Sequence, residues 1–268
     1  MTAMTPPSNK PIALRLNVWL LRITRNWLRI VLALLITYSS LPVIAPTLMK
    51  VGLTGPANVI YTLYSAVCHQ FAFRSIFLYG EQPMYPRYNT GSPLKPFESF
   101  VQNLPEFAPD RVLPFPYGPV GDIYAFTGGF QGASREFRGN EEMGYKMTLC
   151  ARDIGIYWAL TAGAIIYTVP LVRRRLRPIP IYIYVILGLA PIGIDGLSQL
   201  LGYPPFNLWP ARETLPAFRI VTGVLFGLMN AWLGLPYLNL SMQETREQIE
   251  SKLKRAGFGD KVQVSSRK

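Results

Sequence analysis

The hydrophobic pattern of the chain consists of long apolar runs separated by charged breaks. A helix needs about 20 apolar residues to cross the hydrocarbon core of a bilayer. We therefore predict an all-α membrane protein with about four transmembrane helices, at residues 27–48, 154–172, 181–201 and 216–238. The first run is too long for the apolar part of a cleaved signal peptide, and we expect it to stay in place as a signal anchor.

Two shorter segments adjoin the first run. Residues 11–26 mix Leu, Ile and Trp with arginines, which is typical of an amphipathic helix at the membrane interface. Residues 56–67 are apolar, but at about 1.5 Å per residue they cannot cross a bilayer. We expect a re-entrant or interfacial helix there, and disorder in the polar residues 1–10.

The segment 81–148 differs from the rest of the chain. It contains nine prolines, which exclude a long helix or a central strand, and many aromatic residues, which argue against simple disorder. We predict a long irregular loop, folded as a compact flap on the membrane domain. It would serve as a lid, a docking surface or a passive covering, and aromatic residues exposed in such number would form an interaction patch.

These segments give a simple domain plan. An amphipathic N-terminus is followed by the first span with the re-entrant segment, the insertion, three spans and a basic tail. The boundaries are 1–26, 27–80, 81–148, 149–240 and 241–268.

Charge predicts the orientation. The formal net charge is +12, and the whole excess lies in the N-terminal segment, the break at residues 173–177 and the tail, whereas residues 50–153 carry nine basic and nine acidic residues. Basic residues concentrate on the cytoplasmic side of membrane proteins. We therefore predict a multi-pass protein of the plasma membrane with both termini cytoplasmic, the insertion extracytoplasmic, and a basic face that meets anionic headgroups rather than nucleic acid.

Composition limits the chemistry. Half of the residues are hydrophobic and only 16% are charged, with two cysteines and one histidine. These counts exclude a disulfide-rich scaffold, a His-rich metal site and a haem held by two histidines of one chain. No nucleotide-binding loop or nucleophile elbow is present, so whether the protein is an enzyme stays open.

The predicted topology brings distant polar residues to one membrane depth, at the extracytoplasmic end of the bundle. A cysteine beside an imidazole, a second cysteine and nearby carboxylates suit a divalent or soft metal ion. The metal-ligand candidates are Cys68, His69, Cys150, Asp153 and Asp195, and the supporting polar residues are Gln70, Arg74, Arg152, Tyr157, Gln199 and Arg219. Three alternatives remain for the cysteines: a reactive thiol at a helix start, a Cys68–Cys150 disulfide, or inert packing.

Asp195 is a carboxylate within a predicted span, and it is the most informative single residue of the spans. A carboxylate within a span is costly, so it normally faces the bundle interior and has a partner. Arg219 and Arg152 are the expected partners. The pair is either a structural lock between helices or part of a small-solute or proton pathway.

Small residues predict where helices approach closely. Gly155, Ala159 and Gly163 are spaced by four, as are Gly223, Gly227 and Ala231. We interpret both rows as packing seams without chemistry.

Four blocks of residues carry a resemblance to a known family. They are Cys68-His69-Gln70 with Arg74-Ser75, Cys150-Ala151-Arg152-Asp153, Ile194-Asp195-Gly196, and Arg219 with Thr222-Gly223. In these blocks the chain resembles the small prokaryotic membrane proteins of domain-of-unknown-function family 2085. Family members often have a second cysteine where Asp153 stands, so the resemblance implies a mixed-ligand site here rather than a redox dithiol. It also implies that the insertion is an addition, and it supplies no activity.

Three functions follow from the sequence. The first is a metal-binding or thiol centre at the extracytoplasmic end of the bundle. The second is a non-catalytic subunit of a larger membrane complex that docks through the aromatic loop. The third is a solute or proton pathway through Asp195 and Arg219, which with so few spans would require an oligomer.

Overall fold

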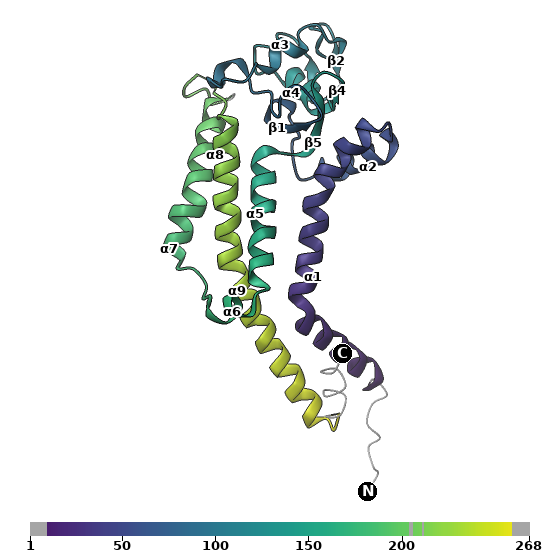
Figure 1. The fold of residues 1–268 in the computed structure, drawn as a ribbon, viewed down its shortest axis with the longest axis vertical. Coiled ribbons are helices and arrows are strands. Elements are labelled where there is room, and N and C mark those ends of the chain that lie inside the picture. Colours follow the sequence, from purple (N-terminus) through teal and green to yellow (C-terminus); the bar gives the residue numbers. More distant parts are fainter. Residues whose placement is uncertain (1–9, 204–205, 211, 259–268) are drawn as a thin grey trace.

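The chain forms a bundle of long helices with a small folded unit at one end (Figure 1). The computed structural model describes residues 10–203, 206–210 and 212–258, so the disorder expected before residue 10 and at the end of the tail lies outside it. The bundle contains α1 (Lys10–Lys50), α5 (Ala151–Tyr167), α8 (Ala190–Gly202) and α9 (Pro216–Arg255). The short α7 (Ile181–Ile183) and a π-helical segment (Tyr184–Leu189) run directly into α8.

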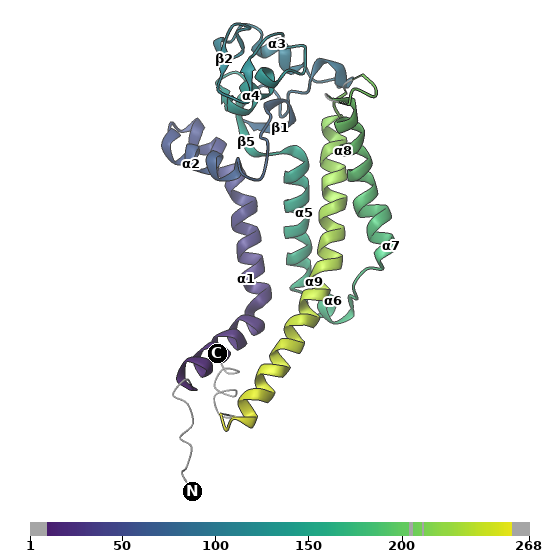
Figure 2. The same ribbon diagram turned by 180° about the vertical axis from the view of Figure 1, so that it is seen from behind.

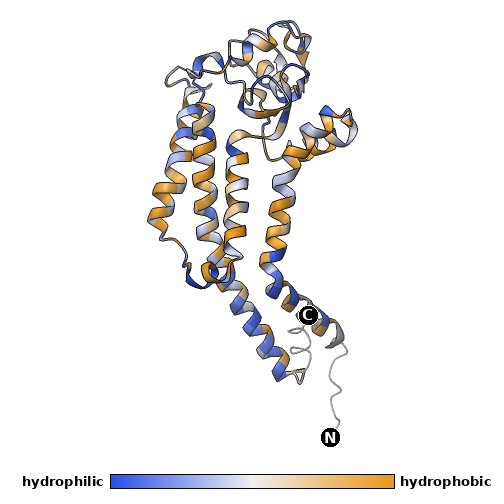
Figure 3. Ribbon diagram, viewed as in Figure 1, coloured by the Kyte–Doolittle hydropathy of each residue, from blue (hydrophilic) through white to orange (hydrophobic). Residues whose placement is uncertain are grey.

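In the part of the chain that the structure describes, three helical stretches are long and apolar enough to cross a membrane. They are Ile12–Lys50, Ile181–Gly202 and Pro216–Arg255. Figure 3 shows apolar residues along the middle of the helices and hydrophilic residues over the lower part of α9. Three of the four predicted spans therefore correspond to such helices. The fourth, α5, is 17 residues long and ends at Tyr167, before the predicted end at residue 172.

The helices α5 and α9 pack side by side through the predicted glycine seams. A Cβ atom at Gly223 would lie 2.2 Å from the carbonyl oxygen of Arg152, and one at Gly227 would lie 2.2 Å from that of Ile156. Neither position has room for a side chain, which lets the two backbones approach closely. The seams thus hold the start of α5 against the start of α9.

The two long helices extend beyond the apolar region and meet again. Leu21 of α1 packs against Ile249 and Leu253 of α9, and Arg25 forms an ion pair of 2.8 Å with Glu250. The helix α9 continues without a break through the start of the basic tail to Arg255. The lower ends of α1 and α9 lie at the end of the molecule opposite the small unit (Figure 2).

Two short helices lie at opposite ends of the bundle. The 11-residue α2 (Thr54–Tyr64) follows α1 after a tight turn and lies across its end (Figure 1). Its residues Ala57 and Ile60 pack with Ala45 of α1. The helix α6 (Pro170–Arg175) forms the turn between α5 and α7.

Residues 71–150, here called the cap, form the small unit. Its main sheet is antiparallel with the order β1 (Ser75–Leu78), β5 (Gly144–Cys150) and β4 (Gly139–Asn140), and β2 (Val112–Leu113) pairs with β3 (Gly118–Pro119). Short helices α3 (Phe97–Val101) and α4 (Gly128–Glu136) pack beside the sheets, with 3-10 turns at Ala72–Arg74, Tyr88–Thr90 and Pro105–Phe107. The segment predicted as a long irregular loop thus contains short strands and helices, and β5 forms because it carries no proline and pairs with β1, which lies before the proline-rich stretch.

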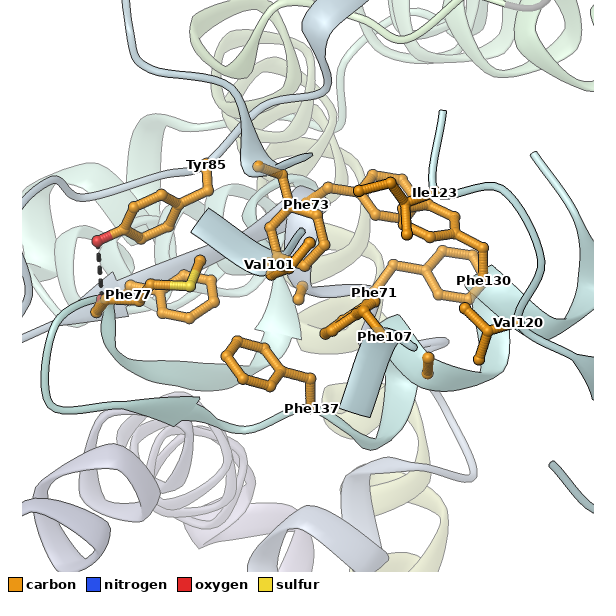
Figure 4. Close-up of a cluster of buried hydrophobic side chains, with 14 of the residues drawn as sticks. Phe71, Phe73, Phe77, Tyr85, Val101, Phe107, Val120, Ile123, Phe130 and Phe137 are labelled. Carbon is orange, nitrogen blue, oxygen red and sulfur yellow. Dashed lines mark hydrogen bonds between the residues drawn. The ribbon is translucent and has the colours of Figure 1, made fainter. Parts of the chain in front are cut away.

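The aromatic residues of the cap mostly point inward and form its core (Figure 4). Phe73 stacks on Phe130 with ring centroids 5.6 Å apart, and Phe97 and Phe107 pack against the same cluster. Phe115, in contrast, is 98% exposed. Most of the aromatic residues expected as an interaction patch thus stabilise the cap itself.

Candidate functional site

The two cysteines meet where the cap joins the bundle. Cys150 is the last residue of β5 and the N-cap residue of α5. Cys68 follows α2, and the backbone N–H of Cys68 donates to the Tyr64 carbonyl at 3.0 Å. The Sγ atoms of Cys68 and Cys150 lie 3.2 Å apart, with both thiols free. The register of β1 on β5 pairs Ser75 with Cys150 and so holds the chain after Cys68 beside the start of α5.

Backbone donors surround the Cys68 sulfur. The N–H of Gln70 donates to it at 3.4 Å and the N–H of Cys150 at 3.3 Å. Gln70 has a φ of 56°, and its side-chain amide donates to the Tyr61 carbonyl at 2.8 Å. Gln70 therefore shapes the turn around the sulfur rather than supplying a ligand atom.

Asp153 completes a group of three ligand atoms. The atoms that Cys68, Cys150 and Asp153 can offer to a metal ion all lie within 4.8 Å of one another. Asp153 lies in the first turn of α5, three residues after its N-cap residue Cys150. The structure thus brings together three of the five residues predicted as ligands.

The two thiols differ in acidity. The hydrogen bond to Cys150, followed by burial, raises the pKa of Cys68. Accepting that hydrogen bond lowers the pKa of Cys150, and the guanidinium groups of Arg74 and Arg219 lower it further against the effect of burial. Cys150 is therefore the more acidic thiol of the pair, which agrees with the low thiol pKa expected at a helix start.

His69 and Asp195 lie elsewhere. His69 is exposed, and its ring centroid lies 5.4 Å from that of Phe71. Among the described residues, neither His69 nor Asp195 joins the group of three. Tyr157 packs its ring on Tyr38 of α1, with centroids 4.5 Å apart, at the edge of the cluster that contains Cys68.

Asp195 has a full set of partners. It forms an ion pair with Arg152 of α5, one of the two partners predicted for it, and accepts hydrogen bonds from Thr214 at 2.5 Å and Gln199 at 3.1 Å. Arg212 lies farther away, at 3.9 Å. This network locks α5 to α8 and to the segment before α9.

Arg219 pairs with Glu213 rather than with Asp195. The Glu213 carboxylate is buried and also accepts from Nε of Arg74 at 3.0 Å and from the Tyr203 hydroxyl. Arg219 donates in addition to the Gln199 side chain at 2.7 Å, which links the two networks. Charges from Arg74 and Arg219 hold the pKa of the Glu213 carboxyl low despite its burial.

Together these networks place an excess of positive charge beside the thiols. Three arginines, Arg74, Arg152 and Arg219, face two carboxylates, Asp195 and Glu213. The Nε atom of Arg152 is buried without a hydrogen-bond partner in the described structure. These five side chains together therefore carry one net positive charge, and Asp153 of the ligand group is not among them.

Lys146 is a buried residue of this region that the sequence analysis did not identify. Its ammonium group is fully buried and donates to the carbonyls of Gln70, Arg135 and Ser134 at 2.7, 2.7 and 3.1 Å. Burial lowers its pKa to about 7. Nothing in the local pattern distinguished this lysine, or Glu213 on the turn before α9, from solvated residues.

Comparison with known proteins agrees with this picture of the membrane part. Residues 134–233 match the model of a family described as predicted membrane protein (DUF2085), which confirms the resemblance over that part of the chain. The chain is also 35% identical over 94 residues to an uncharacterized protein of Methanocaldococcus jannaschii. The aligned part covers 35% of this chain and 54% of the relative, so the chain spans about half the length of the curated relative. No solved structure matches the chain.

Proposed function

We propose that this membrane protein holds a borderline-soft divalent metal ion, such as Zn²⁺, through Cys68, Cys150 and Asp153. The site would lie on the extracytoplasmic side, between the cap and the bundle. The observation that carries the proposal is the convergence of two sulfurs and a carboxylate within 4.8 Å, from segments 82 positions apart. Thiolate sulfur and carboxylate oxygen are both ligands of Zn²⁺.

The spacing of the sulfurs suits a metal ion after a small adjustment. A tetrahedral ion with metal–sulfur bonds of about 2.3 Å separates two sulfurs by about 3.8 Å. The sulfurs of Cys68 and Cys150 are 3.2 Å apart, so they need to separate by only a few tenths of an ångström. Three protein ligands would leave a fourth position for water or a substrate.

Charge also supports the proposal. Two thiolates and a carboxylate with a divalent ion carry one net negative charge. The neighbouring network of Arg74, Arg152, Arg219, Asp195 and Glu213 carries one net positive charge. Metal binding would release the proton of Cys68, because the thiolate is the form that binds a metal ion.

The proposed topology has four spans, with α5 as the second. At about 1.5 Å per residue, the 17 residues of α5 extend about 26 Å, close to the thickness of the hydrocarbon core. We place both termini in the cytoplasm and the cap outside the plasma membrane, because the basic excess lies at the end opposite the cap. This topology can be tested with single cysteines added in the cap and in the α6 turn, which are labelled with an impermeant reagent. Equal labelling of both positions would contradict the proposed topology.

Elemental analysis of the purified protein tests the metal site. We expect about one metal ion per chain in the wild type and in His69→Ala, because His69 lies outside the group of three ligands. Cys150→Ser and Asp153→Asn should each lose most of the metal. Metal-free wild type with both thiols oxidised would replace the proposal with a structural disulfide.

The structure favours neither of the other two predicted functions with a specific observation. Asp195 and Arg219 each have hydrogen-bonded partners of opposite charge within the bundle. The aromatic residues that would form a docking patch mostly lie in the core of the cap. We therefore propose neither a solute pathway nor an accessory subunit.

A further inference from the structure

A second polar site lies at the end of the bundle opposite the cap. A cavity of about 700 Å³ opens between α1, the α6 turn and α9. Its lining includes five arginines and, among the described residues, no acidic side chain: Arg25, Arg173, Arg174, Arg177 and Arg246. This concentration of one charge around a cavity differs from the networks near the cap, in which arginines form ion pairs with carboxylates.

Most of these arginines have no acidic partner of their own. Arg25 forms an ion pair with Glu250 at 2.8 Å. In residues 10–203, 206–210 and 212–258, no carboxylate lies within ion-pair distance of Arg173, Arg174, Arg177 or Arg246. The cavity therefore presents positive charge that an anion would balance.

Packing holds the arginine-bearing turn in place. Val172 and Leu176 pack against a cluster that contains Trp27, Tyr167 and Leu235. The Trp232 side chain of α9 donates to the Arg177 carbonyl at 3.1 Å. Because the apolar residues of the turn face the bundle, its arginines are held at the mouth of the cavity.

The lining is amphipathic in a way that suits a lipid. Trp27, Tyr167 and Leu240 line the cavity together with the arginines. Trp27 and Tyr167 are buried in the bundle and form part of the apolar wall of the cavity, and arginine binds phosphate oxygens through paired N–H donors. Basic pockets between transmembrane helices on the cytoplasmic side bind anionic lipid headgroups.

We propose that this cavity binds the phosphodiester headgroup of an anionic phospholipid. The site is independent of the proposed metal centre. The shared chemistry is a phosphate group held by arginines, and the membrane is its source because the cavity lies between α1 and α9, which are long and apolar enough to cross a bilayer.

Native mass spectrometry of the purified protein in mild detergent tests this proposal, with phosphatidylglycerol and phosphatidylcholine as probes. We expect preferential retention of phosphatidylglycerol by the wild type. The double variant Arg177→Gln/Arg246→Gln should bind it about 25-fold more weakly, because each arginine near a lipid headgroup contributes about fivefold in affinity. The charge-conserving Arg177→Lys/Arg246→Lys should bind it with an affinity between those of the wild type and the glutamine variant, because lysine keeps the charge and loses the paired donors.

The matched control is Arg175→Gln/Arg255→Gln. It removes the same charge from exposed neighbours that do not line the cavity, and affinity should change less than about threefold. Equal losses of phosphatidylglycerol affinity in Arg177→Gln/Arg246→Gln and in Arg175→Gln/Arg255→Gln would overturn the proposal. They would show that the basic end of the bundle attracts anionic lipid diffusely. Stoichiometric displacement of the lipid by millimolar inorganic phosphate would also overturn it, by making a soluble phosphate the ligand.

Discussion

Arg74 of the cap and Glu213, on the turn before α9, form a buried two-point ion pair. Nε of Arg74 donates to one carboxylate oxygen at 3.0 Å, while an Nη group contacts the other. The same carboxylate accepts from Arg219. One side chain thus connects the cap to the bundle beside the candidate metal ligands.

Glu213→Gln should strongly destabilise the protein. It would leave the buried charges of Arg74 and Arg219 without their carboxylate, and breaking a buried pair costs about 3–5 kcal/mol. We expect a clear fall in the thermal unfolding midpoint in mild detergent. The control is Glu141→Gln, since Glu141 forms an exposed ion pair with Lys50 and its loss should leave the midpoint unchanged.

Alanine at Gly223 or Gly227 should separate α5 from α9. The added Cβ would meet a carbonyl oxygen of α5 at 2.2 Å in each case, and overpacking of this kind costs about 1–3 kcal/mol. Gly234→Ala is the matched control, because a Cβ there meets nothing within 4 Å. Equal unfolding midpoints for all three variants would show that the seam does not limit the approach of the helices.

Phe130→Ala should unfold the cap before the bundle. Phe130 is fully buried among the aromatic rings of the cap, and removal of a buried phenylalanine side chain costs about 3–5 kcal/mol. Limited proteolysis should cut the variant within residues 81–148 much faster than the wild type. Phe115→Ala removes a ring that is 98% exposed and should leave the cleavage rate unchanged.

Lys146 should make stability depend on pH in the alkaline range. Burial lowers its pKa from 10.5 to about 7, so between these values the unfolded chain binds a proton that the folded protein has released. Stability contributed by this group therefore rises as the pH rises from about 7 to about 10.5. Below pH 7 both states carry the proton, and the charged amine is a constant cost of burial.

Lys146→Met should remove this part of the pH dependence. Thermal unfolding midpoints of wild type and variant, measured from pH 6.5 to 9.5, should differ most at the low end and converge as the pH rises. Lys95→Met, at an exposed position, should follow the wild-type curve. Parallel curves for Lys146→Met and wild type would contradict a neutral buried amine.

The apolar segments of this protein were determined by the sequence itself. A stretch of about 20 apolar residues indicates a membrane helix whatever the rest of the chain contains. Glycine spacing likewise indicated the surfaces through which α5 and α9 meet, because a missing side chain has the same effect in any close contact. The placement of Cys150 at the start of a helix followed from the same local pattern.

Which charged residues form ion pairs, and which candidate ligands meet, was decided only by the tertiary structure. Arg219 and Arg152 were equally plausible partners of Asp195, and the fold gave Arg152 to Asp195 and Arg219 to Glu213. Cys68 meets Cys150 and Asp153, whereas the adjacent His69 faces outward, because the turn at Gln70 sets the direction of each side chain. These outcomes depend on contacts between segments tens of residues apart, and no local pattern of hydrophobic and polar residues encodes such contacts.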